Sequence, residues 1–105
     1  RVVCDRFTVW AGSSPAYIYL FMEALALAGV KHGLPKDQAV DIVTQTVLAS
    51  AQNLSQGQDS PHDLMDKISS PGGTTIAGLA DLEKTGLTAS VISGIDATIA
   101  RAKEL

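Results

Sequence analysis

Cysteine is nearly absent from this 105-residue sequence, in which Cys4 is the only thiol. One thiol cannot form a disulfide within the chain and cannot build a thiolate cluster for zinc. We therefore expect Cys4 to be unpaired in a reducing compartment. The opening residues also lack the apolar run of a signal peptide, and residue 1 is arginine instead of methionine. A cytoplasmic protein, trimmed at its N-terminus, is the expectation from these features.

Positive charge and histidine are also scarce. The sequence has eight basic and eleven acidic residues, for a net charge of −3, and its basic residues do not cluster in a stripe or patch. The chain therefore offers no cluster of Lys and Arg side chains that could bind a phosphate backbone, which argues against a nucleic-acid partner. His32 and His62 are the only histidines, and neither lies one helical turn from a second pair of ligands, so no metal site is predicted. Asp63 and Asp66 are expected to form a solvated helix face.

Aromatic residues make up only 5% of a chain that is 46% hydrophobic. Small apolar residues favour closely packed helices over a β-sandwich, and the length suits one domain. Proline and glycine alternate along the chain in the order expected of helix starts and helix ends. The prolines that open helices are Pro15, Pro35 and Pro61, and the glycines that close them are Gly33, Gly57 and Gly86. An all-α fold of about five helices follows.

The helices are expected at about 15–32, 36–56, 60–68, 73–86 and 88–103. Ser13 or Ser14 would cap the first of them. Residues 7–10 favour a strand by propensity. Residues at helical spacing that should face inward are Val40, Val43, Val47, Ala51 and Leu54, then Ile76, Leu79 and Leu82, and finally Val91, Ile95, Ile99 and Ala102.

The first helix is apolar on nearly every side. Thirteen of the sixteen residues from Pro15 to Val30 are apolar, and Glu23 is the only charge among them. Such a helix must be covered all round. The run is shorter than the ~20 residues that a bilayer core requires, and Gly29 interrupts it. The rest of so small a chain offers little cover, so we expect a partner subunit to supply it.

One segment combines a rigid turn, two glycines and two hydroxyls at a helix start, namely Ser69–Thr75 (SSPGGTT). Backbone N–H groups at such a start, approached closely over glycine, form an anion site. Gly73 and Gly78 have the spacing of a phosphate-binding loop, but Leu79 follows in place of lysine. No G-x-G-x-x-G occurs, so no dinucleotide-binding unit is present. Spacing alone allows two interpretations, a glycine-rich helix cap or a site for a small carboxylate or phosphate.

Several blocks, in order, resemble the second domain of pyrroline-5-carboxylate reductases over roughly residues 7–105. They are Ala11–Tyr17 (AGSSPAY), Glu23–Leu25 (EAL), Ala28–Lys31 (AGVK), Gly33–Pro35 (GLP), Gln45–Leu48 (QTVL) and, most specifically, Ser69–Leu79 (SSPGGTTIAGL). Ser14 departs from the family pattern, in which many members have glycine.

This resemblance implies a helical domain like the C-terminal domain of 6-phosphogluconate dehydrogenase, interlocked with that of a second subunit. Residues 11–105 would form this dimerisation and substrate-binding domain, and residues 1–10 a remnant of an interdomain connection or an added segment. By resemblance, Asp5–Val9 would be helical. The whole enzyme reduces 1-pyrroline-5-carboxylate to L-proline in proline biosynthesis, and its N-terminal Rossmann domain binds NADPH or NADH. The fragment alone would be inactive, and its assembly would be a homodimer or a higher oligomer.

The family's site residues fall, by resemblance, on the glycine-rich segment. Ser70, Gly72, Gly73, Thr74 and Thr75 would bind the substrate, whose carboxylate faces the backbone N–H groups. Thr75 would hydrogen-bond the region of the ring nitrogen and take part in catalysis. Ser13, Ser14 and Pro15 would contact the cofactor. Two alternatives stay open: a stand-alone helical oligomerisation module, and the C-terminal domain of another NAD(P)-dependent reductase of a small acid.

Overall fold

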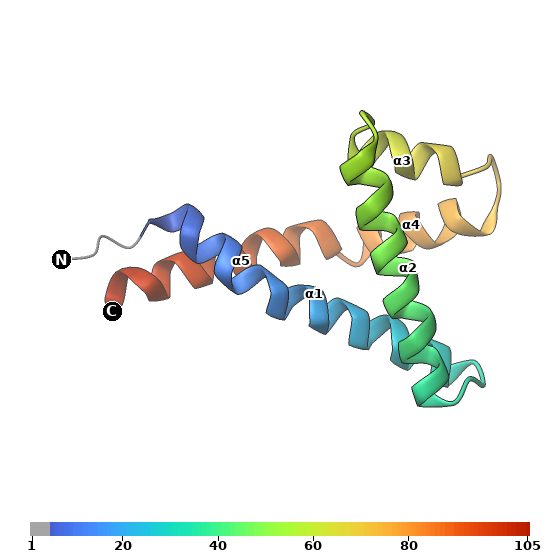
Figure 1. Cartoon of the computed structure of the whole chain (residues 1–105), viewed down its shortest axis with the longest axis horizontal. Helices are drawn as coiled ribbons and strands as arrows, with labels where there is room; N and C mark the ends of the chain where they lie inside the picture. Colours follow the sequence, from blue (N-terminus) through green and yellow to red (C-terminus); the bar gives the residue numbers. More distant parts are fainter. Residues whose placement is uncertain (1–4) are drawn as a thin grey trace. The chain divides into compact units, whose positions relative to one another are not determined.

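The structure is a computed structural model that describes residues 5–105, in which five α-helices and no strand are found (Figure 1). The all-α prediction is therefore confirmed. The prediction of an unpaired Cys4 thiol concerns a residue outside the described part of the chain. The helices are α1 (Arg6–Lys31), α2 (Lys36–Gln56), α3 (Pro61–Ile68), α4 (Thr74–Lys84) and α5 (Leu87–Glu104).

Helix α1 begins at Arg6, well before the predicted start near Pro15. Asp5 caps it: its Oδ1 accepts the Phe7 N–H at 3.0 Å, and its carbonyl accepts the Val9 N–H at 3.0 Å. These bonds are those of an N-cap residue, so the prediction of a Ser13 or Ser14 cap is wrong. The strand predicted at residues 7–10 is also wrong, because the Asp5 cap starts a helix there. The helical reading that the resemblance implied is confirmed from Arg6 onward.

Pro15 consequently lies inside α1 instead of in its first turn. A proline there has no N–H to offer the carbonyl of Ala11, and an interior proline costs a helix about 3 kcal/mol. The chain also divides beside it into two compact units. One contains Ser14–Pro61, and the other contains the described residues 5–13 together with His62–Leu105.

The unit Ser14–Pro61 consists of most of α1 and all of α2, two helices that meet at the short loop between them and diverge from it (Figure 1); it is called the hairpin below. Gly33, at φ +108°, closes α1 as predicted. The Leu34 N–H bonds the Gly29 carbonyl and the Gly33 N–H bonds the Val30 carbonyl, both at 3.0 Å. Together these bonds form the Schellman arrangement that ends many helices in a left-handed glycine. Pro35 then starts α2 at the predicted residue.

The hairpin is closed by small side chains. Ala26 on α1 is 1% exposed and Ala39 on α2 is 2% exposed, and they are the only buried residues in the described part of the chain. A methyl group placed on Gly29 would lie 3.2 Å from Leu34 Cδ1 and 3.4 Å from the Ala39 side chain. Lys36 Nζ adds an ion pair of 2.9 Å to Glu23 Oε2. The helices therefore touch at small residues and at one charged pair.

In the other unit, α4 and α5 contact each other across a bend at Gly86. Gly86 has φ +91°, Thr85 Oγ1 donates to the Asp81 carbonyl at 3.1 Å, and Thr88 Oγ1 donates to Glu83 Oε1 at 2.7 Å. The predicted inward-facing residues Leu79, Ile95 and Ile99 are only half-buried. This unit, too, leaves its helices without a covered core.

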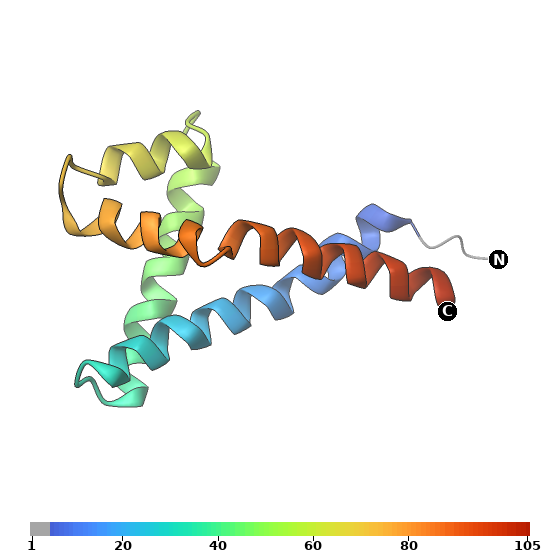
Figure 2. The ribbon, with the colours of Figure 1, turned by 180° about the vertical axis from the view of Figure 1, so that it is seen from behind.

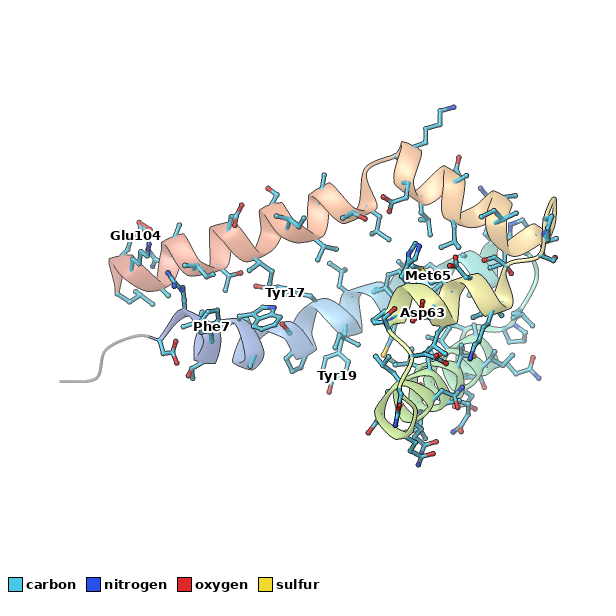
Figure 3. The ribbon with its side chains drawn as sticks, turned by 90° about the horizontal axis from the view of Figure 1, so that it is seen from above. Phe7, Tyr17, Tyr19, Asp63, Met65 and Glu104 are labelled. Carbon is cyan, nitrogen blue, oxygen red and sulfur yellow. The ribbon has the colours of Figure 1, made fainter. Side chains whose placement is uncertain are left out.

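Large apolar side chains are exposed along α1. Figure 3 shows Tyr17 and Tyr19 leaving opposite sides of the helix, and they are 39% and 68% exposed. Leu20 is 70% exposed, and Leu27 is 52% exposed. By length and composition α1 passes the test for a membrane-crossing helix. The sequence thus predicted an apolar helix that its own chain does not cover.

Candidate functional site

The segment between α3 and α4 forms a tight turn (Figures 1 and 2). The Gly73 N–H bonds the Ser70 carbonyl at 3.0 Å, with Pro71 and Gly72 between them. Gly72 has φ +70°, which glycine adopts without strain. A type II turn requires a positive φ at its third residue, as Gly72 has, and often carries proline at its second residue. The predicted rigid turn is therefore present at the predicted place.

Helix α4 opens directly from this turn. Gly73, at φ −83° and ψ 177°, is its N-cap, and no side chain of the described residues makes the cap hydrogen bond. The N–H groups of a first helical turn have no partner within the helix, and the helix dipole adds partial positive charge there. Thr74 and Thr75 are the first two residues of α4, and both are exposed. The turn therefore presents backbone donors and two hydroxyls to solvent at one helix start.

Ser70 lies against this helix start. A Cβ atom built on Gly73 would collide with Ser70 Oγ and would lie 3.2 Å from the Ser70 carbonyl oxygen. The Ser70 hydroxyl thus occupies space that only glycine at position 73 leaves open. This one turn and the start of α4 bring together all five predicted substrate-binding residues, Ser70, Gly72, Gly73, Thr74 and Thr75. Their arrangement suits a small anion that accepts several hydrogen bonds.

Ser69 belongs to the predicted segment but was not among the predicted site residues, and it anchors the turn to α3. Its Oγ donates to the Met65 carbonyl at 2.8 Å, and its N–H donates to the Asp66 carbonyl at 3.3 Å. Figure 3 labels Met65 on α3, ahead of this turn. The sequence signal for Ser69 was weak, because a serine after a helix is common in any loop.

The predicted cofactor contacts Ser13, Ser14 and Pro15 lie within α1. The two serines are half-buried and Pro15 is exposed. Their backbone is helical, so they do not form a helix start of their own. Any contact with a cofactor would come from their side chains on the surface of α1.

A second concave feature lies within the helical hairpin. Tyr19, Met22, Glu23, Val40 and Val43 line a pocket of about 170 Å³. Its lining is apolar apart from the Glu23 carboxylate, which is engaged by Lys36. A pocket of this kind suits an apolar side chain better than a polar substrate.

Ionisable groups are dispersed elsewhere. Across residues 5–105, no three side chains of His, Cys, Asp or Glu gather in a way that could hold a metal ion. His62 Nε2 lies 3.8 Å from Asp66 Oδ2 one turn along α3, and both side chains are more than two-thirds exposed. Within the described residues, the turn before α4 is therefore the arrangement with the most chemistry to offer.

Comparison with known proteins gives a consistent result. A family model described as pyrroline-5-carboxylate reductase dimerisation matches residues 3–105. The pyrroline-5-carboxylate reductase of Aquifex aeolicus is 46% identical over 101 residues, which are 96% of this chain and 38% of that protein. The chain therefore spans less than two-fifths of the length of this relative.

Solved structures agree with the sequence comparison. A 1-pyrroline-5-carboxylate reductase from Streptococcus pyogenes superposes with a TM-score of 0.93 at 68% identity, over 95% of this chain and 39% of that one. A Plasmodium falciparum pyrroline carboxylate reductase with NADP bound gives a TM-score of 0.90 at 36% identity, over 94% of this chain and 38% of that one.

Proposed function

Because this chain belongs to the pyrroline-5-carboxylate reductase dimerisation family, we propose that it is the helical dimerisation and substrate-binding domain of such a reductase. The proposed reaction is reduction of the C=N bond of 1-pyrroline-5-carboxylate to L-proline with NADPH or NADH, in the cytoplasm. One observation carries the assignment of the site. The turn Ser70–Gly73 and the start of α4 offer uncapped backbone donors and hydroxyls that fit a substrate carboxylate.

Dimerisation is the first part of the proposal. Only Ala26 and Ala39 are buried among the described residues, while Tyr19 and Leu20 on α1 are more than two-thirds exposed. A second copy that covers α1 removes this apolar area from water, and obligate dimer interfaces bury above roughly 2,000 Å². Glu23, which lies within α1 and is nearly half exposed in its ion pair with Lys36, favours a protein partner over lipid as the cover, because charged groups are costly in a bilayer core. Sedimentation at low micromolar concentration should give a dimer or larger assembly, and a folded monomer would contradict the proposal.

Binding and orientation are what the turn contributes to catalysis. The substrate carries a carboxylate next to the imine, so fixing the carboxylate at the start of α4 also fixes the ring. The Ser70 hydroxyl and the N–H groups of Thr74 and Thr75 would hold the carboxylate oxygens. The Thr75 hydroxyl would then lie beside the imine nitrogen and stabilise the proton that it gains. Threonine is a weak acid at neutral pH, so positioning contributes more than proton donation.

The cofactor would be held mainly by a part of the enzyme outside this chain. The sequence contains no dinucleotide fingerprint, although a related structure binds NADP. When bound, the nicotinamide supplies the hydride. Ser13, Ser14 and Pro15 would add contacts from α1. Calorimetry on the 105-residue chain alone should show no tight NADPH binding, and an activity assay should show no reduction of the imine. Low-micromolar NADPH binding would contradict the proposal that the cofactor is held mainly outside this chain.

Thr75 provides the sharpest test, in the full-length enzyme. Thr75→Ala should lower kcat by about tenfold or more, because the lost hydrogen bond strengthens as charge shifts in the transition state. Thr75→Ser should keep most of the activity. As a plain residue of the first helical turn, Thr75 would behave differently: Thr75→Ala would leave kcat unchanged and change stability by about 0.5 kcal/mol or less, because Gly73 and not Thr75 is the N-cap of α4. A kcat of Thr75→Ala equal to that of the wild type would therefore end the catalytic assignment.

The substrate itself is tested by competition between small acids. The full-length enzyme should turn over the cyclic imine, and turnover of a different small acid in preference would identify another reductase of the same architecture. An assembly with no turnover, even with its nucleotide-binding domain present, would identify an oligomerisation module.

A further inference from the structure

Two adjacent serines open the turn before α4, and they make different contacts. The Ser70 side chain lies against Gly73 at the start of α4. The Ser69 side chain turns back instead, and its Oγ donates to the Met65 carbonyl of α3 at 2.8 Å. A hydroxyl has one hydrogen to donate. The Ser69 hydroxyl is therefore committed to the backbone of α3.

The bond from Ser69 replaces one that α3 loses at its end. In a continuing helix the Met65 carbonyl would accept the N–H of residue 69. Here the Ser69 N–H goes to the Asp66 carbonyl at 3.3 Å, which leaves the Met65 carbonyl without that partner. The Ser69 Oγ takes its place. The side chain and the backbone N–H of Ser69 thus bond two successive carbonyls of the last turn, those of Met65 and Asp66. These two bonds set the direction in which the chain leaves α3.

Ser70 follows directly and is constrained from the other side. Its carbonyl accepts the Gly73 N–H at 3.0 Å, and its Oγ fills the space that a Cβ on Gly73 would need. The placement of Ser70 is therefore set by Ser69 before it and by the turn after it. Loss of the Ser69 hydroxyl would release the first of these constraints and leave every substrate-contacting group chemically intact.

We propose that Ser69 is a positioning residue for the substrate site, which acts by holding Ser70 over the start of α4. This inference rests on the proposed function, because it assigns Ser70 to the substrate carboxylate. It predicts that Ser69 governs substrate affinity and has little influence on the chemical step. A residue that fixes a binding group should affect KM more than kcat.

The test uses the full-length enzyme and the cyclic imine as substrate. Ser69→Ala should raise the KM for the imine about fivefold and change kcat by less than about twofold, with the KM for NADPH unaltered. Ser69→Thr keeps the hydroxyl and should restore KM. Ser69→Val has nearly the shape of threonine without the hydroxyl, so it should behave like Ser69→Ala. Equal KM values for the threonine and valine variants would overturn the proposal.

A double-mutant cycle shows whether Ser69 acts through Ser70. In an enzyme that already carries Ser70→Ala, adding Ser69→Ala should change the KM for the imine by less than about twofold, because the group that Ser69 positions is gone. Additive effects would overturn the inference and leave the proposed site standing. If Ser70→Ala itself leaves KM unchanged, or if the enzyme does not reduce the imine, the proposed function fails and the inference fails with it. Ser69→Thr and Ser69→Val decide the question even if an alanine variant does not fold.

Discussion

The α1–α2 hairpin and the turn between α3 and α4 are held together by different kinds of interaction. In the hairpin, two buried alanines and the Glu23–Lys36 ion pair join helices whose large apolar side chains are exposed. In the turn, directional hydrogen bonds from Ser69 and Gly73 fix the backbone between two helices. All of these bonds lie between Met65 and Gly73.

The chain alone fixes the geometry of the turn, whereas coverage of the apolar side chains of the hairpin needs a partner. Hydrogen bonds of a turn are satisfied over a few residues, so their geometry is available before any assembly forms. Apolar burial needs area, and a two-helix hairpin cannot cover both of its own outer faces. The turn is therefore suited to bind a ligand, and the hairpin is suited to bind a second copy.

A charge on the exposed side of α1 should have the largest effect on this contrast. Leu20 is 70% exposed in the chain, so Leu20→Glu would be harmless on a free surface. If a second copy covers α1, the unpaired carboxylate is buried at the interface, and the dimer dissociation constant should rise at least about a hundredfold. Analytical ultracentrifugation measures it. Gln45→Glu, on the polar side of α2, is the matched control, and an unchanged constant for Leu20→Glu would break the contrast.

Overpacking the contact between the two hairpin helices should have the next largest effect. Ala26 is 1% exposed, so the added atoms of Ala26→Leu have no room, and the free energy of unfolding should fall by about 1–3 kcal/mol. Ala49→Leu adds the same atoms at an exposed position of α2 and should change stability by about 0.5 kcal/mol or less. Urea denaturation at one fixed protein concentration compares them. Equal losses would show that the alanine contact is unimportant.

Two glycines near the site should respond in opposite directions to the same substitution. Gly72 has φ +70°, so Gly72→Ala forces a strained backbone and should lower stability by about 1 kcal/mol. Gly78 lies inside α4 with open space around it, so Gly78→Ala should raise stability by up to about 1 kcal/mol. Melting curves of both variants give the sign. A gain in stability for Gly72→Ala would mean that residue 72 does not adopt the left-handed backbone conformation in solution.

Removal of the hairpin ion pair should have the smallest effect. Both side chains are nearly half exposed, so Glu23→Gln should reduce the stability by less than about 1 kcal/mol. The difference from wild type should shrink further in about 1 M salt, where charges are screened over a few ångströms. Lys36→Gln should give a similar loss, since it breaks the same pair. A large, salt-independent loss would assign Glu23 a role beyond this pair.

Helix ends marked by local chemistry could be predicted from the sequence. The bounds of α2 and α3 were expected at residues 36–56 and near 60–68, and they lie at Lys36–Gln56 and Pro61–Ile68. Pro35, Pro61 and Gly57 mark them, because proline fixes φ and glycine disfavours continuation of a helix, whatever packs nearby. The start of α1 was predicted wrongly because Pro15 was expected to lie in the first turn of the helix. Asp5 caps α1 ten residues earlier, so Pro15 lies inside it.

The candidate site was predictable in its residues and less so in its contacts. Two glycines and two threonines after Pro71 allowed either a glycine-rich cap or a small-anion site, and the structure places them in the turn and in the first two residues of α4. The position of Ser70 Oγ against Gly73 depends on a side-chain rotamer, which residue types alone do not fix. The bond from Ser69 to Met65 likewise depends on how the last turn of α3 ends.

If a second copy covers α1 as proposed, dilution should destabilise this protein, because Ala26 and Ala39 are the only buried side chains among residues 5–105. When a second copy covers α1, mass action links folding to the amount of chain present, and apparent stability falls by a fixed step for each tenfold drop in concentration. Ala26 and Ala39 cannot hold the fold alone, since burial of two methyl groups contributes only about 1–2 kcal/mol. A cell that makes few copies would therefore keep a larger share of them unpaired and exposed to proteolysis.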